Sequence, residues 1–177
     1  MLERLATLLS EQGGLMATLV CSNGGPEHAE QATTVSPARI AAEGPRTEGR
    51  REEYELLVEA IYEGYLLHYG SPRVVRVPEA DLGLLAGDQL YAIGLAQLVA
   101  LGDTVAVSEL ADTITLSALA QSAGELALAD AVWAAGARAV GWGPCDDHRR
   151  AKDLAFAGSP QAIEAMRTSA ERLPAPP

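Results

Sequence analysis

Lysine is almost absent from this chain of 177 residues: Lys152 is the only one among 13 basic residues. Against 24 acidic residues, this leaves a formal net charge of -11. No basic stripe is available to meet a phosphate backbone, so we expect no nucleic-acid partner. A phosphate-binding loop of the Gly-x-x-x-x-Gly-Lys type is excluded as well, because the residue directly before the single lysine is alanine, not glycine.

Cysteine and long uninterrupted apolar runs are also scarce. Cys21 and Cys145 are the only cysteines, and neither belongs to a Cys-x-x-Cys pair, so we expect no disulfide framework and a cytoplasmic location. Residues 1–9 lack the apolar run of a secretory signal. Residues 82–101 are long enough to cross a bilayer, but Asp88 within them costs roughly 2.5–3.5 kcal/mol on insertion, so we expect no membrane span.

Hydrophobic residues make up 48% of the chain, which excludes wholesale disorder and favours one folded domain. Tyr54, Val58, Ile61 and Tyr65 recur at helical spacing and predict a helix over 52–69. Further helices are predicted over 78–101, 104–122, 124–139, 146–157 and 159–173. Since no segment has the pattern of a strand, we predict an all-α fold, a compact bundle of about six helices.

The composition along the chain divides it into four parts. Residues 1–21 form an N-terminal helical segment with a short helix over 2–10. Residues 22–51, rich in glycine, proline and charge, form a long flexible linker. The helical domain covers 52–173, and 174–177 form a frayed tail.

Three side chains of the predicted bundle are candidates for catalysis or binding. Tyr65 belongs to a tyrosine stripe that lines a ligand pocket or packs as a helix face on the core. His68, near a helix end, acts as a general base or is a half-exposed histidine. Asp88, an acid in an apolar run, is a functional carboxylate or a buried group that pairs with a cation such as Arg73 or Arg76.

A second cluster, at residues 145–148, combines Asp146, Asp147 and His148 with a cysteine. These side chains are potential metal ligands, but consecutive residues at the start of a helix point in different directions. We therefore favour a role in capping, with Asp146 or Asp147 as the N-cap of the helix over 146–157. We expect no cofactor.

Part of the bundle resembles a known enzyme family. Residues 58–68, VEAIYEGYLLH, are similar to the segment of trans-isoprenyl diphosphate synthases, the polyprenyl synthetase family, that leads into their first aspartate motif. Residues 85–90, LAGDQL, and residues 98–114 follow that family's pattern further. The similarity extends over about 52–125, and it implies an isoprenoid-synthase-like helical fold that dimerises through this region.

The catalytic aspartates of that family are missing from this sequence. Tyr69 and Gly70 stand where the first aspartate pair is found, and no second aspartate cluster follows. In those enzymes Mg²⁺ bridges the aspartates to a diphosphate, so their loss predicts a protein without that activity. We therefore expect an accessory or regulatory subunit or an oligomeric binding module, as a homo-oligomer or beside an unlike subunit.

Two other interpretations stay open. One is an enzyme or binding protein for an apolar or isoprenoid small molecule, held in a helical cavity near His68 and Asp88. The other is a structural helical module that docks on a larger assembly through residues 22–51.

Overall fold

The computed structural model describes residues 1–20, 36–77 and 79–171. This described part is all-α, and its only strand-like pairing is an isolated antiparallel bridge between Val20 and Val75. The elements are α1 (Leu2–Gln12), α2 (Gly14–Leu19), α3 (Pro37–Glu43), the 3₁₀ helix η2 (Pro45–Thr47), α4 (Arg51–Tyr69), α5 (Ala80–Ala100), α6 (Thr104–Ser122), α7 (Leu126–Trp142), α8 (Asp146–Phe156) and α9 (Ala162–Glu171).

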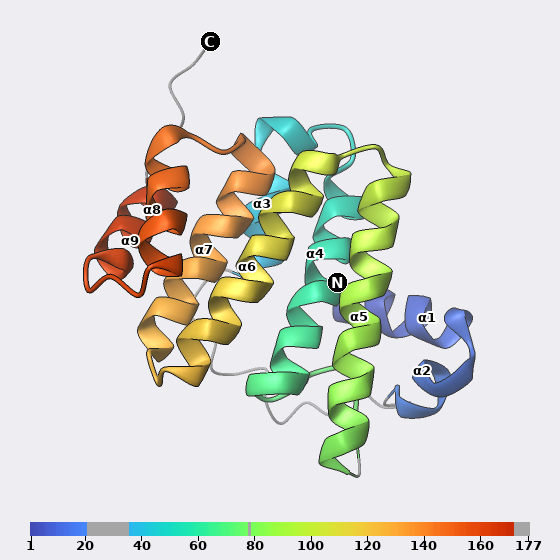
Figure 1. Ribbon diagram of the computed structural model, residues 1–177. Coiled ribbons are helices and arrows are strands. Elements are labelled where there is room, and N and C mark those ends of the chain that lie inside the picture. Colours follow the sequence, from blue (N-terminus) through green and yellow to red (C-terminus); the bar gives the residue numbers. More distant parts are fainter. Residues whose placement is uncertain (21–35, 78, 172–177) are drawn as a thin grey trace.

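Two antiparallel helix pairs, α4 with α5 and α6 with α7, form the centre of the molecule (Figure 1). Helix α3 packs against both α4 and α7 and so joins the two pairs. Helices α1 and α2 lie on the side of α4 and α5, and α8 and α9 lie on the side of α7. The predicted helical bundle is therefore confirmed.

Aromatic and branched side chains fill the space between the two central pairs. Tyr54, Ile61 and Tyr65 of α4 share one buried cluster with Leu110 of α6 and Trp133 of α7. Two further clusters lie beneath α1 and α2 and between α7, α8 and α9. Tyr54 and Tyr65, two tyrosines of the predicted stripe, are thus part of the core.

Side chains that cap the helices explain several of their limits. The carboxylate of Asp103 accepts a hydrogen bond of 2.9 Å from the amide of Ala106 and so caps α6, which begins at residue 104 as predicted. The N-cap of α8, in contrast, is Cys145, which makes no side-chain cap bond. The prediction that Asp146 or Asp147 caps this helix is wrong. Both acids lie in its first turn, where the helix dipole favours them.

The second half of the predicted linker is folded. Helix α3 buries Ala38 and Ala41 completely, and the hydroxyl of Thr47 donates to the carbonyl of Ala41 at 3.0 Å. Gly44 lies so close to Gly141 of α7 that a Cβ would clash with its backbone. Because these small residues pack tightly on α4 and α7, the prediction of a flexible linker is wrong for 36–51. Its first part, up to residue 35, and the predicted tail lie outside the described residues.

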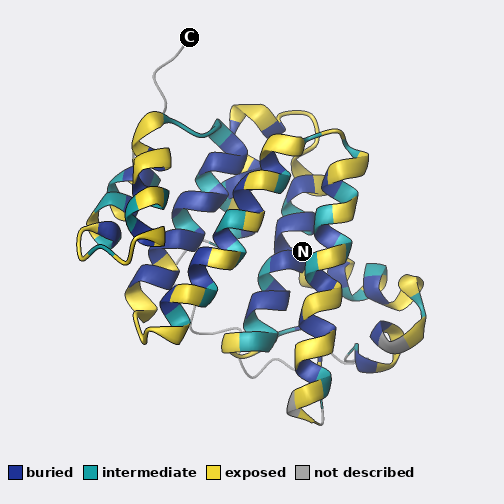
Figure 2. Cartoon of the chain, viewed as in Figure 1, coloured by how far each residue is buried: buried dark blue, intermediate teal, exposed yellow. Residues whose placement is uncertain are grey.

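Helix α5 is the least enclosed of the central helices. Within the described chain, residues 81–100 form one helix that is long and apolar enough to cross a membrane. Only 33% of the 18-residue apolar stretch in this helix is buried. Figure 2 shows exposed positions along much of its outward side. The outward side of α5 is therefore an apolar surface that this chain alone does not cover.

Candidate functional site

His68 and Asp88, two of the predicted site residues, meet where α4 crosses α5. The Nε2 atom of His68 lies 3.2 Å from Oδ1 of Asp88, and the imidazole stacks on the ring of Tyr91 with centroids 5.4 Å apart. Gly87 permits this approach, because a Cβ there would lie 2.6 Å from the imidazole. The His68 Nε2 is not aligned for a hydrogen bond with any described group, so its attraction to Asp88 depends on protonation.

The structure corrects the prediction for Asp88. Its side chain is 70% exposed, so it is not a buried carboxylate that needs a cation. Arg73, one of the predicted partners, pairs with Glu59 and Glu63 of α4. Asp88 is exposed because it lies on the outward side of α5. The sequence of this helix is apolar on nearly every side, so it does not show which side faces solvent.

Tyr65, the third candidate, is a core residue with one polar contact. Its hydroxyl accepts a hydrogen bond of 2.6 Å from the amide of Gln121, and its ring lies 5.2 Å from that of Trp133. Burial raises the pKa of the Tyr65 phenol, and the hydrogen bond from Gln121 offsets part of that rise. Tyr65 therefore joins α4 to α6 and α7 in its neutral form.

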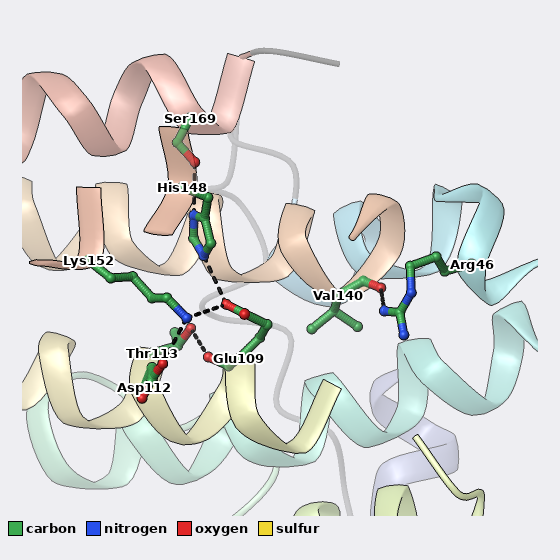
Figure 3. A network of polar contacts seen from close by, with 8 residues as sticks. All are labelled: Arg46, Glu109, Asp112, Thr113, Val140, His148, Lys152 and Ser169. Carbon is green, nitrogen blue, oxygen red and sulfur yellow. Dashed lines mark hydrogen bonds and ion pairs between the residues drawn. The ribbon is translucent and has the colours of Figure 1, made fainter. Parts of the chain in front are cut away.

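A polar contact that the sequence analysis missed closes the opposite end of the bundle. The Tyr54 hydroxyl donates to Asp103 at 2.8 Å, and burial together with this bond raises the pKa of Tyr54 to about 12. Arg46 donates to the same carboxylate at 2.9 Å. It also donates to the carbonyl of Val140 at 2.6 Å, the contact drawn in Figure 3. This group holds η2, α4, α6 and α7 together.

Two buried glutamates on α4 hold the connection between α4 and α5. Glu63 is 0% exposed and accepts from the backbone amides of Arg73 and Val74, both at 2.6 Å. The Arg73 guanidinium lies 3.2 Å from Glu63 and 2.5 Å from Glu59. The i, i+4 spacing of two glutamates, the only charged residues between 56 and 67, is the signal that points to this cluster.

His148 is the centre of a second buried network, which spans α6, α8 and α9 (Figure 3). Its Nδ1 atom lies 2.8 Å from the Ser169 hydroxyl, and its Nε2 atom lies 2.9 Å from a carboxylate oxygen of Glu109. Lys152 donates to Glu109 at 2.9 Å and to Asp112 at 2.7 Å. The network bonds the two C-terminal helices to α6.

The members of this network are buried and already have hydrogen-bond partners. Ser169, His148 and Glu109 are 5%, 3% and 5% exposed, and both ring nitrogens of the histidine already have partners. Burial alone would raise the pKa of Glu109. Hydrogen bonds and charge from His148 and Lys152 have the larger combined effect, so the pKa lies below its ordinary value. The carboxylate is therefore held in its charged form.

The weak metal candidates are not brought together. His148 points into the buried network, whereas the Asp146 side chain is 96% exposed and forms an ion pair with Arg149. Asp147 lies beside Asp146 in the first turn of α8. Among the described residues, no group of three histidine, cysteine or acidic side chains is arranged to hold a metal ion.

Comparison of the chain with protein-family models, with curated proteins and with solved structures finds no match. The resemblance to trans-isoprenyl diphosphate synthases therefore stays a prediction. At the point where that family carries its first aspartate pair, α4 ends at Tyr69, and Gly70 is its C-cap.

Proposed function

We propose that this chain is a non-catalytic helical protein that acts as a self-associating module. The observation that carries the proposal is the outward side of α5 and α6. Every exposed residue between Gln89 and Ser122 is uncharged, although the chain as a whole carries a net charge of -11. We call this surface the uncharged face; its members are Gln89, Ala92, Ala96, Val99, Ala100, Gly102, Thr104, Val105, Ser108, Ala111, Thr115, Leu119 and Ser122.

A second copy of the chain is the partner that suits the uncharged face. Two molecules with a charge of -11 repel each other most strongly where their acidic surfaces meet. Contact through the uncharged face keeps those acidic surfaces apart. A two-fold axis places the same patch of each copy against the other. Most of the face consists of small side chains, so helices of two copies approach closely, while Val99 and Val105, 57% and 41% exposed, supply apolar area.

The absence of prenyl-transfer activity is the second part of the proposal. The chain resembles the synthases only in helices that lack both aspartate clusters, and its buried acids are held by amides, arginine, lysine and histidine. Incubation with dimethylallyl and isopentenyl diphosphates and Mg²⁺ should give no longer product. Turnover above a control without protein would contradict this part. A chain that resembles the synthases but lacks their aspartate clusters would also suit the role of an accessory or regulatory subunit of a related synthase.

Self-association is tested with matched glutamate substitutions. Val99→Glu places a charge on the uncharged face, and Phe156→Glu does so on α8, at a side chain of similar exposure, 48%. In light scattering after size exclusion, the wild type and Phe156→Glu should be dimers and Val99→Glu a monomer. A Val99→Glu variant that stays dimeric would show that another surface is used.

The meeting of His68 and Asp88 favours one alternative function. A histidine 3.2 Å from an exposed carboxylate, beside the rings of Tyr69 and Tyr91, suits a binding site or enzyme for an apolar or isoprenoid molecule. Titration with farnesol, followed by tryptophan fluorescence, tests this alternative. Saturable quenching that is weakened by His68→Ala would favour the alternative, and no quenching would remove its support.

A further inference from the structure

Large apolar side chains gather at one end of the four central helices. Helices α4 and α6 end there, and α5 and α7 begin there (Figure 1). Five of the nine large hydrophobic side chains that are exposed in the described part of the chain belong to this end. We call it the apolar end; its members are Tyr69, Leu84, Leu85, Leu119 and Leu126, which are 42–60% exposed.

Polar contacts hold the four helix ends in one place. The hydrogen bond of 2.6 Å between Tyr65 and Gln121 joins the last turns of α4 and α6. The contact of 3.2 Å between His68 and Asp88 joins α4 to α5. The loop from Ser122 to Leu126 keeps α7 beside α6. The helix ends that carry the exposed apolar side chains are therefore fixed relative to one another.

Negative charge surrounds the apolar end. Over 69–90 and 119–130, Arg76 is the one exposed basic residue among those described, against five exposed acids. The acids are Glu79, Asp81, Asp88, Glu125 and Asp130. A second copy would bring two acidic rims together, and an anionic membrane surface would repel this rim as well.

From this combination we infer that the apolar end docks a basic amphipathic helix of another protein. The apolar side of such a helix would cover the leucines, and its lysines or arginines would face the acidic rim. Four helices spaced about 8–10 Å apart present an end roughly 25–30 Å across. A helix of about 18 residues has a matching length of about 27 Å. The apolar end shares only Leu119 with the uncharged face, and its proposed occupant is another protein, so the inference goes beyond self-association.

The test uses two synthetic peptides of about 18 residues with the full-length protein. One is an amphipathic helix of leucine and lysine, and the other has glutamate in place of every lysine. Fluorescence anisotropy of the labelled peptides should show saturable binding of the lysine peptide and at least tenfold weaker binding of the glutamate peptide. Equal binding of both peptides, or no binding of the lysine peptide, would overturn the inference.

Matched variants locate the binding surface. Leu85→Ser and Leu126→Ser should each weaken binding of the lysine peptide at least threefold, whereas Val105→Ser, on the uncharged face, should leave it unchanged. Likewise Glu125→Gln should weaken binding more than Glu164→Gln, which makes the same change of net charge on α9. Equal effects within either pair would show general attraction to an acidic protein and overturn the inference.

The same variants separate this inference from the proposed function. If Leu85→Ser and Leu126→Ser dissociate a dimer but leave peptide binding intact, the apolar end is a contact between copies, and the inference is wrong. If the wild type is a monomer and still binds the lysine peptide at this end, the inference stands and the proposed self-association fails.

Discussion

Glu63 shows at the scale of single residues how this protein accommodates buried charge. Three backbone amides, those of Arg73, Val74 and Val75, lie 2.6–3.4 Å from one of its carboxylate oxygens, and the Arg73 side chain reaches the other. Such an arrangement replaces the hydration that burial removes. The cluster therefore fixes the start of the connection between α4 and α5.

Removal of this one charge should be costly. We predict that Glu63→Gln lowers the free energy of unfolding by about 1.5–3 kcal/mol, because it removes the charge that accepts from Arg73 and the backbone amides and leaves Arg73 paired with Glu59 alone. Asp88→Asn, at a side chain that is 70% exposed, should change it by less than about 0.5 kcal/mol. Urea denaturation of both variants measures the difference, and equal losses would contradict the assignment of the two carboxylates.

The Glu109 network makes a prediction about pH. We predict that Lys152→Met lowers the free energy of unfolding at pH 7 by about 1.5–3 kcal/mol, since it removes a charged hydrogen bond to a buried carboxylate. The pKa of Glu109 lies below its ordinary 4.5, so its contribution is present above that pH and is lost as the pH falls through the lowered value. The wild type and variant should therefore converge in acid.

Arg149→Met is the control for Lys152→Met. Arg149 lies on the same helix, but its ion pair with Asp146 is exposed, and we expect a loss below about 0.5 kcal/mol. Denaturation curves between pH 3 and 8 measure both variants. A loss for Lys152→Met that does not shrink in acid would contradict the predicted charge state of Glu109.

Single residues were the hardest feature to predict from the sequence. The stripe that contains Tyr65 was correctly considered as a core face, because its helical spacing is a local property. The partners of His148 are 39 and 21 residues away, and no local pattern relates Glu109 or Ser169 to a histidine of α8. The exposure of Asp88 depends on which side of α5 the other helices leave open.

At the scale of helices, the contact between α4 and α5 depends on glycine. Gly64 and Gly87 face each other so closely that a Cβ on Gly87 would lie 3.0 Å from the carbonyl oxygen of Gly64 and 2.6 Å from the His68 ring. The lack of a side chain on these two glycines thus allows the close approach of α4 and α5.

We predict that Gly87→Ala lowers the free energy of unfolding by about 1–3 kcal/mol, because the added methyl displaces His68 or separates the two helices. Helix propensity alone favours alanine by about 1 kcal/mol, so a loss of stability would be a direct sign of the clash. Ser108→Ala, on the exposed side of α6, is the control and should be neutral or slightly stabilising. Thermal denaturation measures both, and a stabilised Gly87→Ala would contradict the described crossing.

Helix limits were predicted well where sequence punctuation is strong. The predicted helix over 104–122 matches α6, which Asp103 caps, and the predicted helix over 52–69 matches α4 to within one residue, with Gly70 as its C-cap. Helix α3 was assigned to a linker because its surroundings are rich in glycine and proline. Its alanines are buried against α4 and against α7, which lies much further along the chain, so local composition gave no sign of their burial.

At the scale of the whole molecule, charge and apolar surface are separated. Charged side chains are absent from the exposed positions of α5 and α6 between 89 and 122, and acids surround the apolar end formed by the four helix termini. Residues 82–101 are so uniformly apolar that the sequence does not indicate which side of α5 faces outward. The extent of this side followed only from the positions of the other helices.

The central claim is that two copies associate through the uncharged face of α5 and α6. Sedimentation equilibrium of the intact chain is its most direct test. The account predicts twice the chain mass of 18.5 kDa for the wild type and a single chain mass for Val99→Glu, with both remaining helical by circular dichroism. A wild type that sediments as a single chain at all concentrations up to about 100 µM, where even a weak dimer of Kd about 10 µM would form, would contradict it.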